Sequence, residues 1–133
     1  MDVDLERLVR DRAGGACEYR KLPEALCFFS FEIDHIIALK HGGQTSAENL
    51  ALACYYNSAK GPNIAGIDPE SGVIVRLFHP RRDRWHRHFR WQGGQLVGRT
   101  SIGRATIVVL EINHPEAIAF RESLANEGRF PSA

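Results

Sequence analysis

The most informative segment of this chain reads Phe31-Glu32-Ile33-Asp34-His35-Ile36-Ile37-Ala38-Leu39. It is rich in aromatic and β-branched residues, which favour extended backbone, so we predict a strand over residues 28–39. An acid, Asp34, stands directly beside a histidine, His35, within this strand. The glycine pair Gly42-Gly43 follows and indicates a turn. The segment therefore predicts a strand that carries two titratable side chains and ends before a turn.

The residues after this turn allow two structures. Thr45-Ser46-Ala47-Glu48 resembles the capping box of a helix, and propensity alone predicts one helix over residues 46–60. The other structure has a turn, a strand over residues 50–54 and a short helix from about Tyr56. We expect the second structure because of the family resemblance described below, and not because of propensity.

Boundary signals place the remaining elements. Glycine and proline end helices and mark turns, whereas Ser, Thr and Pro are frequent at helix starts. The predicted elements are a helix over 4–13 ended by Gly14-Gly15, a tight loop over 17–23, a strand over 73–78, a hairpin of 89–91 with 95–98 across 92–94, a helix from Thr100 or Ser101 to about Ile112, and a last helix from His114-Pro115-Glu116 to near Gly128. This mixture predicts an α+β chain.

The size and composition of the chain fit one ordinary globular domain over residues 1–133, of which 44% are apolar. No apolar run reaches the roughly 18 residues of a membrane-spanning helix, so we expect no membrane partner. The charged start, Met1-Asp2-Val3-Asp4, lacks the apolar run of a signal peptide, which predicts a cytoplasmic protein. Three cysteines are too few, and an odd number, for a disulfide framework.

Positive charge is concentrated in one segment although the net charge is only +1. Between His79 and Trp91 lie five arginines and a single acid, Asp83. Guanidinium groups bind phosphates, so a segment of this kind predicts a positive face toward a nucleic acid. We expect core roles for Phe89 and Trp91. Arg81, Arg82, Arg84 and Arg87 are the candidates for this face, and the family resemblance described below makes them the predicted DNA-binding residues.

Taken in order, several motifs resemble the HNH endonucleases. They are Cys17-Glu18-Tyr19, Phe31 to Ile37 with its Asp-His pair, Gly42-Gly43, Asn49-Leu50-Ala51-Leu52-Ala53-Cys54, and Asn57-Ser58-Ala59-Lys60-Gly61. The resemblance covers a motif core of about residues 13–62. The accessory extension, about residues 63–133, looks like that of a compact bacterial branch of the family.

The resemblance implies a fold, a cofactor and a set of roles. The fold is a ββα-metal finger, here with an N-terminal helix and a C-terminal β and helical extension. His35 would be the general base, Asp34 and Asn57 the ligands of one Mg²⁺ or Mn²⁺ ion, Asn49 the residue that ties the loop between the strands, and Lys60 a cation near a phosphate. The implied function is metal-dependent endonuclease action on DNA with low sequence specificity. The alternative is a degenerate HNH domain that binds DNA without cleaving it.

The chain departs from the family at its cysteines. Many relatives hold a structural zinc with two Cys-x-x-Cys pairs, but here Arg20 stands three residues after Cys17, and Asn57 three residues after Cys54. We therefore expect no structural zinc, because such a site needs about four ligands. The second motif is also one residue short. In the alternative alignment Asn57 takes the lost cysteine's place and Ser58 becomes the metal ligand.

Two of these functional assignments have structural alternatives. Asn57 could simply cap a helix, and Lys60 could be a solvated cation at a helix end. Glu32 is a weak additional candidate for a metal ligand. Adjacent strand residues point to opposite faces, so Asp34 and His35 can share a site only if the strand twists or bulges, or if the site wraps around its edge.

Overall fold

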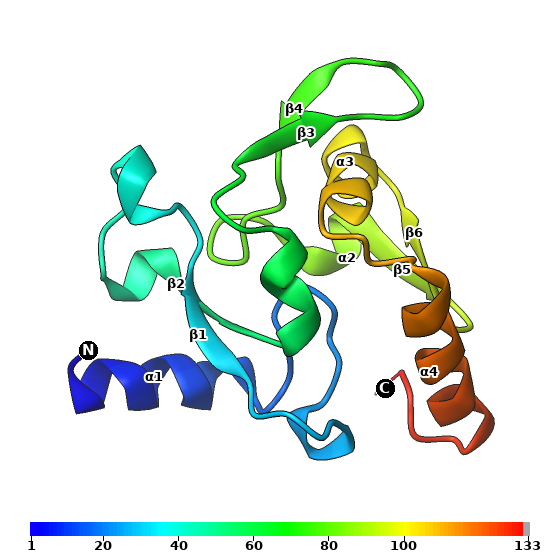
Figure 1. Cartoon of the computed structure of the whole chain (residues 1–133), viewed down its shortest axis with the longest axis horizontal. Helices are drawn as coiled ribbons and strands as arrows, with labels where there is room; N and C mark the ends of the chain where they lie inside the picture. The colour runs from blue at the N-terminus through cyan, green and yellow to red at the C-terminus, as the bar shows by residue number, and fades with distance from the viewer. Residues whose placement is uncertain (132–133) are drawn as a thin grey trace. The chain divides into compact units, whose positions relative to one another are not determined.

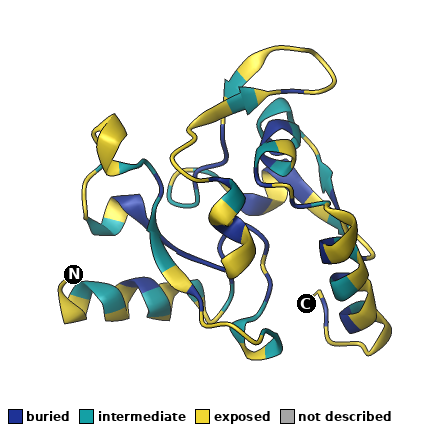
Figure 2. Cartoon of the chain, viewed as in Figure 1, coloured by how far each residue is buried: buried dark blue, intermediate teal, exposed yellow. Residues whose placement is uncertain are grey.

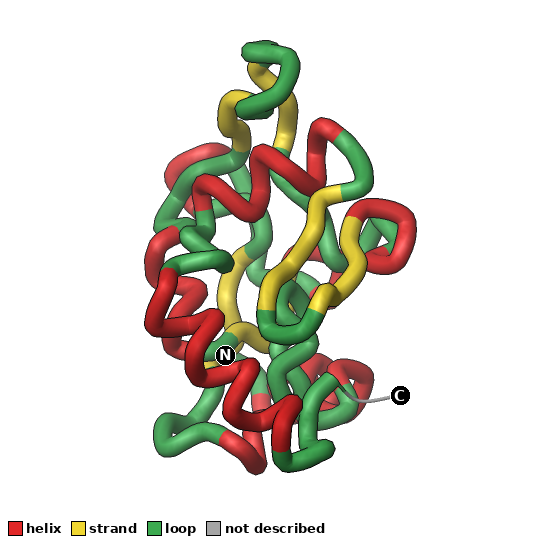
Figure 3. The backbone as a smooth tube through the Cα atoms, turned by 90° about the vertical axis from the view of Figure 1, so that its right-hand side faces the viewer, coloured by secondary structure: helices red, strands yellow, loops and turns green. Residues whose placement is uncertain are grey.

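The computed structural model describes residues 1–131 as a mixture of helices and small antiparallel sheets, which confirms the α+β class. Its backbone contacts divide the chain into two compact units. The first comprises residues 1–63 and 79–82, and the second comprises residues 64–78 together with the part of the chain after residue 82. The strands form three separate two-stranded hairpins, drawn as short yellow pairs in Figure 3. That the whole chain is one domain stays a prediction.

The first unit begins with helix α1, Val3–Ala13, which lies beside the hairpin of the same unit (Figure 1). The Asp2 side chain caps its start by accepting a hydrogen bond from the Asp4 N–H. Gly14 ends the helix in the left-handed conformation, φ 63°, which glycine adopts without steric cost. The predicted helix over residues 4–13 is thus confirmed within one residue. Its buried residue, Val9, faces the hairpin side of the unit.

The hairpin consists of β1, Glu32–His35, and β2, Leu50–Ala53, in antiparallel register from Glu32 opposite Ala53 to His35 opposite Leu50. Every residue of β2 is buried, whereas β1 is only partly covered (Figure 2). The strand predicted over residues 28–39 is wrong in length. A strand needs a ladder partner, and β2 supplies only its four residues.

The loop between β1 and β2 holds two short 3₁₀ turns, η2 over Leu39–His41 and η3 over Ala47–Asn49. A further 3₁₀ helix, η1, spans Glu24–Leu26 before β1, and after β2 the chain forms η4 over Tyr55–Ala59. The structure therefore has a turn, a strand and a short helix in this region, not one long helix over residues 46–60. The short helix predicted from about Tyr56 is present, but its hydrogen bonding is of the 3₁₀ type.

The second unit contains two hairpins, β3 (Ala65–Ile67) with β4 (Ile74–Arg76) and β5 (Phe89–Gln92) with β6 (Gln95–Gly98). The β5–β6 hairpin confirms the sequence prediction, whereas β3 was not predicted. The strand predicted over residues 73–78 is shorter than expected. Leu77 lies outside β4, although its N–H still donates to the Ile64 carbonyl oxygen at 3.0 Å, and the Phe78 N–H donates to the Thr106 hydroxyl.

The helices of this unit are α2 (Trp85–His88), α3 (Ser101–Val109) and α4 (Pro115–Asn126). Thr100 caps α3, and proline is the first residue of α4, as predicted. Phe89 is fully buried against Trp85 and Phe78, which confirms its core role. Trp91 is half-buried and packs edge-on against Phe130. Over the described residues 1–131, every helix is too short or too polar to cross a bilayer.

Candidate active site

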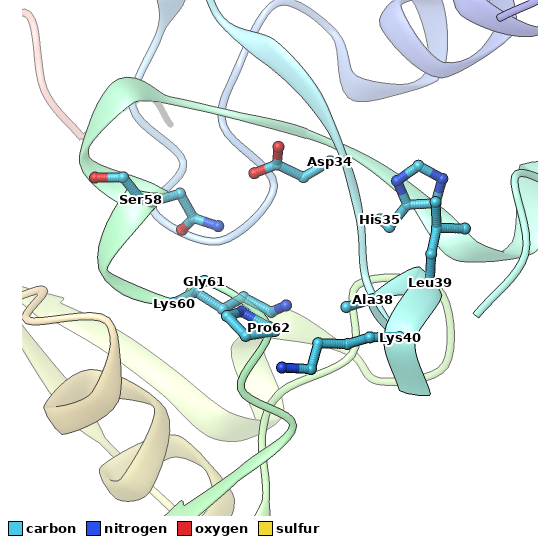
Figure 4. Close-up of a pocket in the computed structure, with 10 residues that line it drawn as sticks. Asp34, His35, Ala38, Leu39, Lys40, Ser58, Lys60, Gly61 and Pro62 are labelled. Atoms are coloured by element: carbon cyan, nitrogen blue, oxygen red, sulfur yellow. The ribbon is translucent and has the colours of Figure 1, made fainter. Parts of the chain in front are cut away.

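A pocket of about 460 Å³ lies in the first unit, at the residues that the sequence singled out. Its wall includes Asp34 and His35 from β1 and Asn57 and Ser58 from η4. Lys60, the residue that follows η4, also lines it. Figure 4 shows the Asp34 carboxylate on the side of β1 where Ser58 and Lys60 lie. The structure thus brings together four of the five predicted site residues and the alternative ligand Ser58.

Asp34 and His35 leave the β1 ribbon on opposite sides, as the alternation of a strand requires (Figure 4). The register of β1 with β2 is regular, so no bulge reorients them. Both nevertheless border the pocket, because His35 is the last residue of β1 and the chain turns after it. The site therefore wraps around the end of the strand.

The Asp34 carboxyl is half-buried at the pocket. Burial raises its pKa above the ordinary value of 3.8, and the negative charge of Glu32 raises it further. The positive charges of Lys60 and His35 act in the opposite direction and are the smaller effects. A group whose ionised form is disfavoured in this way gains from a nearby cation, which would favour the carboxylate.

His35 has one ring nitrogen engaged. Its Nε2 lies 2.8 Å from the hydroxyl oxygen of Thr45, which stands in the loop between η2 and η3. When Nε2–H donates to this hydroxyl, Nδ1 keeps its lone pair and can accept a proton. Sequence analysis missed Thr45 as a site residue. The only signal at this position was the capping-box pattern, which points to a helix start and not to a histidine partner.

Asn49 lies at the end of η3, and its side chain ties the loop together. Its Oδ1 accepts the Ile37 N–H at 2.9 Å, while Nδ2 donates to the carbonyl oxygens of Ile37 and Gln44, both at 2.9 Å. The loop-tying hydrogen bonds predicted for this residue are present in the structure. They fix the backbone that follows His35, and Asn49 itself does not line the pocket.

Asn57 is the buried polar residue of η4, with 2% of its surface exposed. Neither its Oδ1 nor its Nδ2 has a hydrogen-bond partner among residues 1–131. Burying an amide without partners costs free energy, so such a group needs a partner of another kind, a water molecule, an ion or a ligand. Ser58, the alternative ligand, is exposed and also borders the pocket.

Lys60 is buried, so the structural alternative of a solvated cation at a helix end is wrong. Its ammonium group donates to the Ile36 carbonyl oxygen at 2.9 Å, just after β1. Burial lowers the pKa of Lys60, and the charge of Asp34 acts against this shift. The cation is therefore held at the pocket wall by the strand end, close enough to Asp34 for the two groups to influence each other.

The positions of the eroded cysteine pairs form a second buried cluster. Burial acts to raise the pKa of Cys17, but hydrogen bonds from Cys54 and from backbone N–H groups outweigh it and bring the pKa to about 6. The pKa of Cys54 is raised by the same thiol contact and by burial. Arg20 lies alongside, fully buried, and donates to the Tyr56 carbonyl oxygen at 2.9 Å. A guanidinium group thus occupies the position three residues after Cys17, where the family pattern described above has its second cysteine.

The four arginines predicted to bind DNA differ in their surroundings. Arg81 forms an ion pair with Glu18, and both side chains are largely covered. Arg82, in the same unit, is exposed. Arg84 and Arg87 are exposed residues of the second unit. The Glu18 carboxylate also accepts the Leu52 N–H at 2.8 Å, so Arg81 is joined to the hairpin through it.

Comparison with known protein families identifies a domain in one part of this chain. Residues 17–61 match the family model of the HNH endonuclease, so this part of the chain carries an HNH domain. Neither the curated proteins nor the solved structures gave a match. An HNH domain indicates a nuclease or another activity on nucleic acids, and HNH nucleases in general depend on a metal ion. The matched residues contain every member of the pocket wall discussed above.

Proposed function

Since residues 17–61 carry an HNH domain, we propose that this chain is a metal-dependent endonuclease that hydrolyses phosphodiester bonds in DNA with low sequence specificity. One observation carries the proposal. The buried amide of Asn57, which has no hydrogen-bond partner among residues 1–131, borders the same pocket as Asp34 and His35. A carboxylate, an imidazole and an unpartnered amide around one pocket are the parts that single-metal hydrolysis needs.

The donor set fits a hard divalent cation. The carboxylate of Asp34 and the Oδ1 of Asn57 are oxygen ligands of the kind that Mg²⁺ and Mn²⁺ prefer. No group of three or more His, Cys, Asp and Glu able to hold a metal occurs over residues 1–131. The remaining ligands would therefore be water and phosphate oxygens, which is usual for Mg²⁺. The ion would neutralise the scissile phosphate and stabilise the leaving oxygen.

The other residues serve the same reaction. His35, held by Thr45 through Nε2, takes the proton of the attacking water at Nδ1. Asn49 keeps the loop after His35 in place. Lys60, anchored on Ile36, supplies positive charge at the phosphate. In this proposal β1, β2 and η4 are the two strands and the helix of the ββα-metal finger. The exposed Arg82, Arg84 and Arg87 contribute to holding DNA, whereas Arg81, which was also predicted to do so, is engaged by Glu18.

A second function, DNA binding without cleavage, is favoured by the cysteine cluster. Arg20 stands where the first cysteine pair would have its second thiol, the motif before Asn57 is one residue short, and in the alternative alignment Asn57 takes the place of the other lost thiol. A finger that has lost its zinc can retain phosphate contacts while its metal ligands lose their alignment. The binder therefore predicts salt-sensitive association with DNA and no product in the presence of any divalent ion.

Nicking of supercoiled plasmid separates the two functions. The wild-type chain is incubated with Mg²⁺ or Mn²⁺, and again with excess chelator. His35→Ala should reduce the nicking rate by about a hundredfold or more, the usual contribution of a general base. The matched control is His41→Ala, because His41 is exposed and is not part of the pocket wall. Equal nicking by the wild type and His35→Ala, or none by either, would refute the proposed mechanism.

A further inference from the structure

Four exposed aromatic residues stand next to the candidate active site. Phe28 is 99% exposed, Phe29 61%, Tyr55 62% and Tyr56 41%. Two of them precede β1 and two begin η4. We name these four residues the aromatic platform. Aromatic side chains normally bury most of their surface, so a group of them left in water marks a surface that contacts something else.

The rings of the platform are arranged relative to one another. Phe29 and Tyr55 stack with their centroids 5.1 Å apart and their planes 24° from parallel. Tyr55 also meets Tyr56 edge-on at 6.0 Å. Beneath Tyr56 lies the buried guanidinium of Arg20, 5.7 Å from the ring centroid. Three of the four rings thus support one another, Phe28 extends into solvent, and the Arg20 guanidinium under Tyr56 is itself covered.

The platform and the pocket share their supporting elements. η4 carries Tyr55 and Tyr56 and then, without interruption, the pocket residues Asn57 and Ser58. On the other segment, Phe29 is five residues before Asp34. At about 3.3 Å per extended residue, Phe29 and Asp34 are at most about 16 Å apart along the backbone. Stacked bases of one strand rise about 3.4 Å each, so this distance corresponds to roughly five nucleotides. A strand whose phosphate lies in the pocket can therefore reach the platform with its neighbouring bases.

We propose that the aromatic platform stacks unpaired bases of the nucleic acid whose phosphate occupies the pocket, so that the preferred substrate is single-stranded or locally unpaired. The inference rests on the proposed function and names its substrate class. In a duplex the base faces are covered by their neighbours, and only edges and backbone are offered to a protein. Exposed ring faces suit the faces of unpaired bases, for which aromatic stacking is the common form of recognition.

Binding without cleavage tests the inference directly. A fluorescein-labelled oligothymidylate and a duplex of equal length are titrated with the full chain in chelator, and anisotropy is recorded. The single strand should bind at least about tenfold more tightly than the duplex. Phe28→Ala and Tyr55→Ala should each weaken single-strand binding by about tenfold, or about 1.4 kcal/mol, because each removes one ring on which a base stacks. The controls Phe28→Tyr and Tyr55→Phe retain a ring and should bind as the wild type does.

Photo-cross-linking identifies the contact. A single strand containing 5-iodouracil should cross-link to peptides that include Phe28, Phe29, Tyr55 or Tyr56. Cross-links confined to other peptides, or single-strand binding that the alanine variants leave unchanged, would overturn the inference. So would self-association that the same variants abolish while nucleic-acid binding persists, since the platform would then be a protein interface.

The outcomes also separate this inference from the proposed function. Ring-dependent binding of single strands without nicking under any metal supports the platform and refutes the nuclease. Nicking that requires His35 but is indifferent to the rings and to strandedness refutes the platform and supports the nuclease. Because Phe28 is almost wholly exposed, its substitution leaves the fold intact, and circular dichroism of each variant verifies this.

Discussion

Asn49 binds both backbone polar groups of Ile37: its Oδ1 accepts the N–H, and its Nδ2 donates to the carbonyl oxygen, each at 2.9 Å. This pairing mimics a strand partner and fixes the chain two residues after His35. Gly43 packs so closely against the same carbonyl that an added Cβ would overlap it. The loop between β1 and β2 is thus closed by one carboxamide and one glycine.

Asn49→Ala should destabilise the protein by about 2–3 kcal/mol, since it leaves the polar groups of Ile37 and the carbonyl of Gln44 without their partner. Urea unfolding followed by circular dichroism measures the change. The control is Gln44→Ala, which removes only an exposed side chain and should stay within about 0.5 kcal/mol. If Asn49→Ala unfolds at the same urea concentration as the wild type, the loop is held by other contacts.

Alanine substitution should lower the stability of the fold at Arg81 but not at Arg82. Arg81→Ala removes the charged partner of the buried Glu18 carboxylate and leaves it the Leu52 N–H, which should destabilise the fold by about 2–3 kcal/mol. Arg82→Ala should change stability by less than about 0.5 kcal/mol. If Arg82 binds a phosphate, its loss should reduce the salt dependence of DNA binding by about one unit of slope. An Arg81→Ala chain as stable as the wild type would show that the pair with Glu18 is not structural.

Asp34→Asn should make the protein more stable at neutral pH. The pKa of Asp34 is raised in the folded state by burial and by Glu32, so its favourable contribution is complete below the unfolded carboxyl pKa and is lost as the pH rises through the folded pKa. The stability gap between the variant and the wild type is therefore largest near pH 7 and shrinks on acidification to about pH 4. Urea unfolding at the two pH values measures it. A gap of equal size at both would contradict the assignment.

Divalent cations should stabilise the wild-type chain, and a chelator should reverse the effect. A ligand at a hundred times its dissociation constant adds about 2.7 kcal/mol to the free energy of unfolding, which a thermal melt with Mn²⁺ detects. Asn57→Ala should lose this response, whereas Ser58→Ala should keep it. The reverse result would assign the ligand position to Ser58, and a response retained by both variants would place the ion elsewhere.

Thr45 should act as a positioning residue for His35. Thr45→Val keeps the shape but removes the hydroxyl that lies 2.8 Å from Nε2. We expect kcat to fall by about tenfold with little change in KM, a smaller loss than for the general base itself. Thr45→Ser, which retains the hydroxyl, should recover most of the rate. A change in KM alone would indicate a role in binding and not in orienting the imidazole.

The sequence was a good guide wherever a local pattern sufficed. Gly14 ends α1, Thr100 caps α3 and Pro115 begins α4, because caps and turns depend on residues a few positions apart. The ordered motifs also selected the residues that border the pocket. The extent of β1 could not be read in this way, because a strand extends only as far as its partner, and β2 stops where η4 begins.

What the sequence by itself determined was the supply of chemical groups: an acid and an imidazole side by side, a later amide and a lysine, in the order of an HNH domain. Only the tertiary structure decided which of these groups are already engaged. Arg81 meets Glu18, Lys60 meets Ile36 and His35 meets Thr45, while Asn57 is buried without such a partner in the part of the chain that the structure describes. The physical reason is that hydrogen bonds form, and side chains become buried, between residues that are close in space. The order of residues along the chain does not say which distant residue the fold brings next to a given side chain.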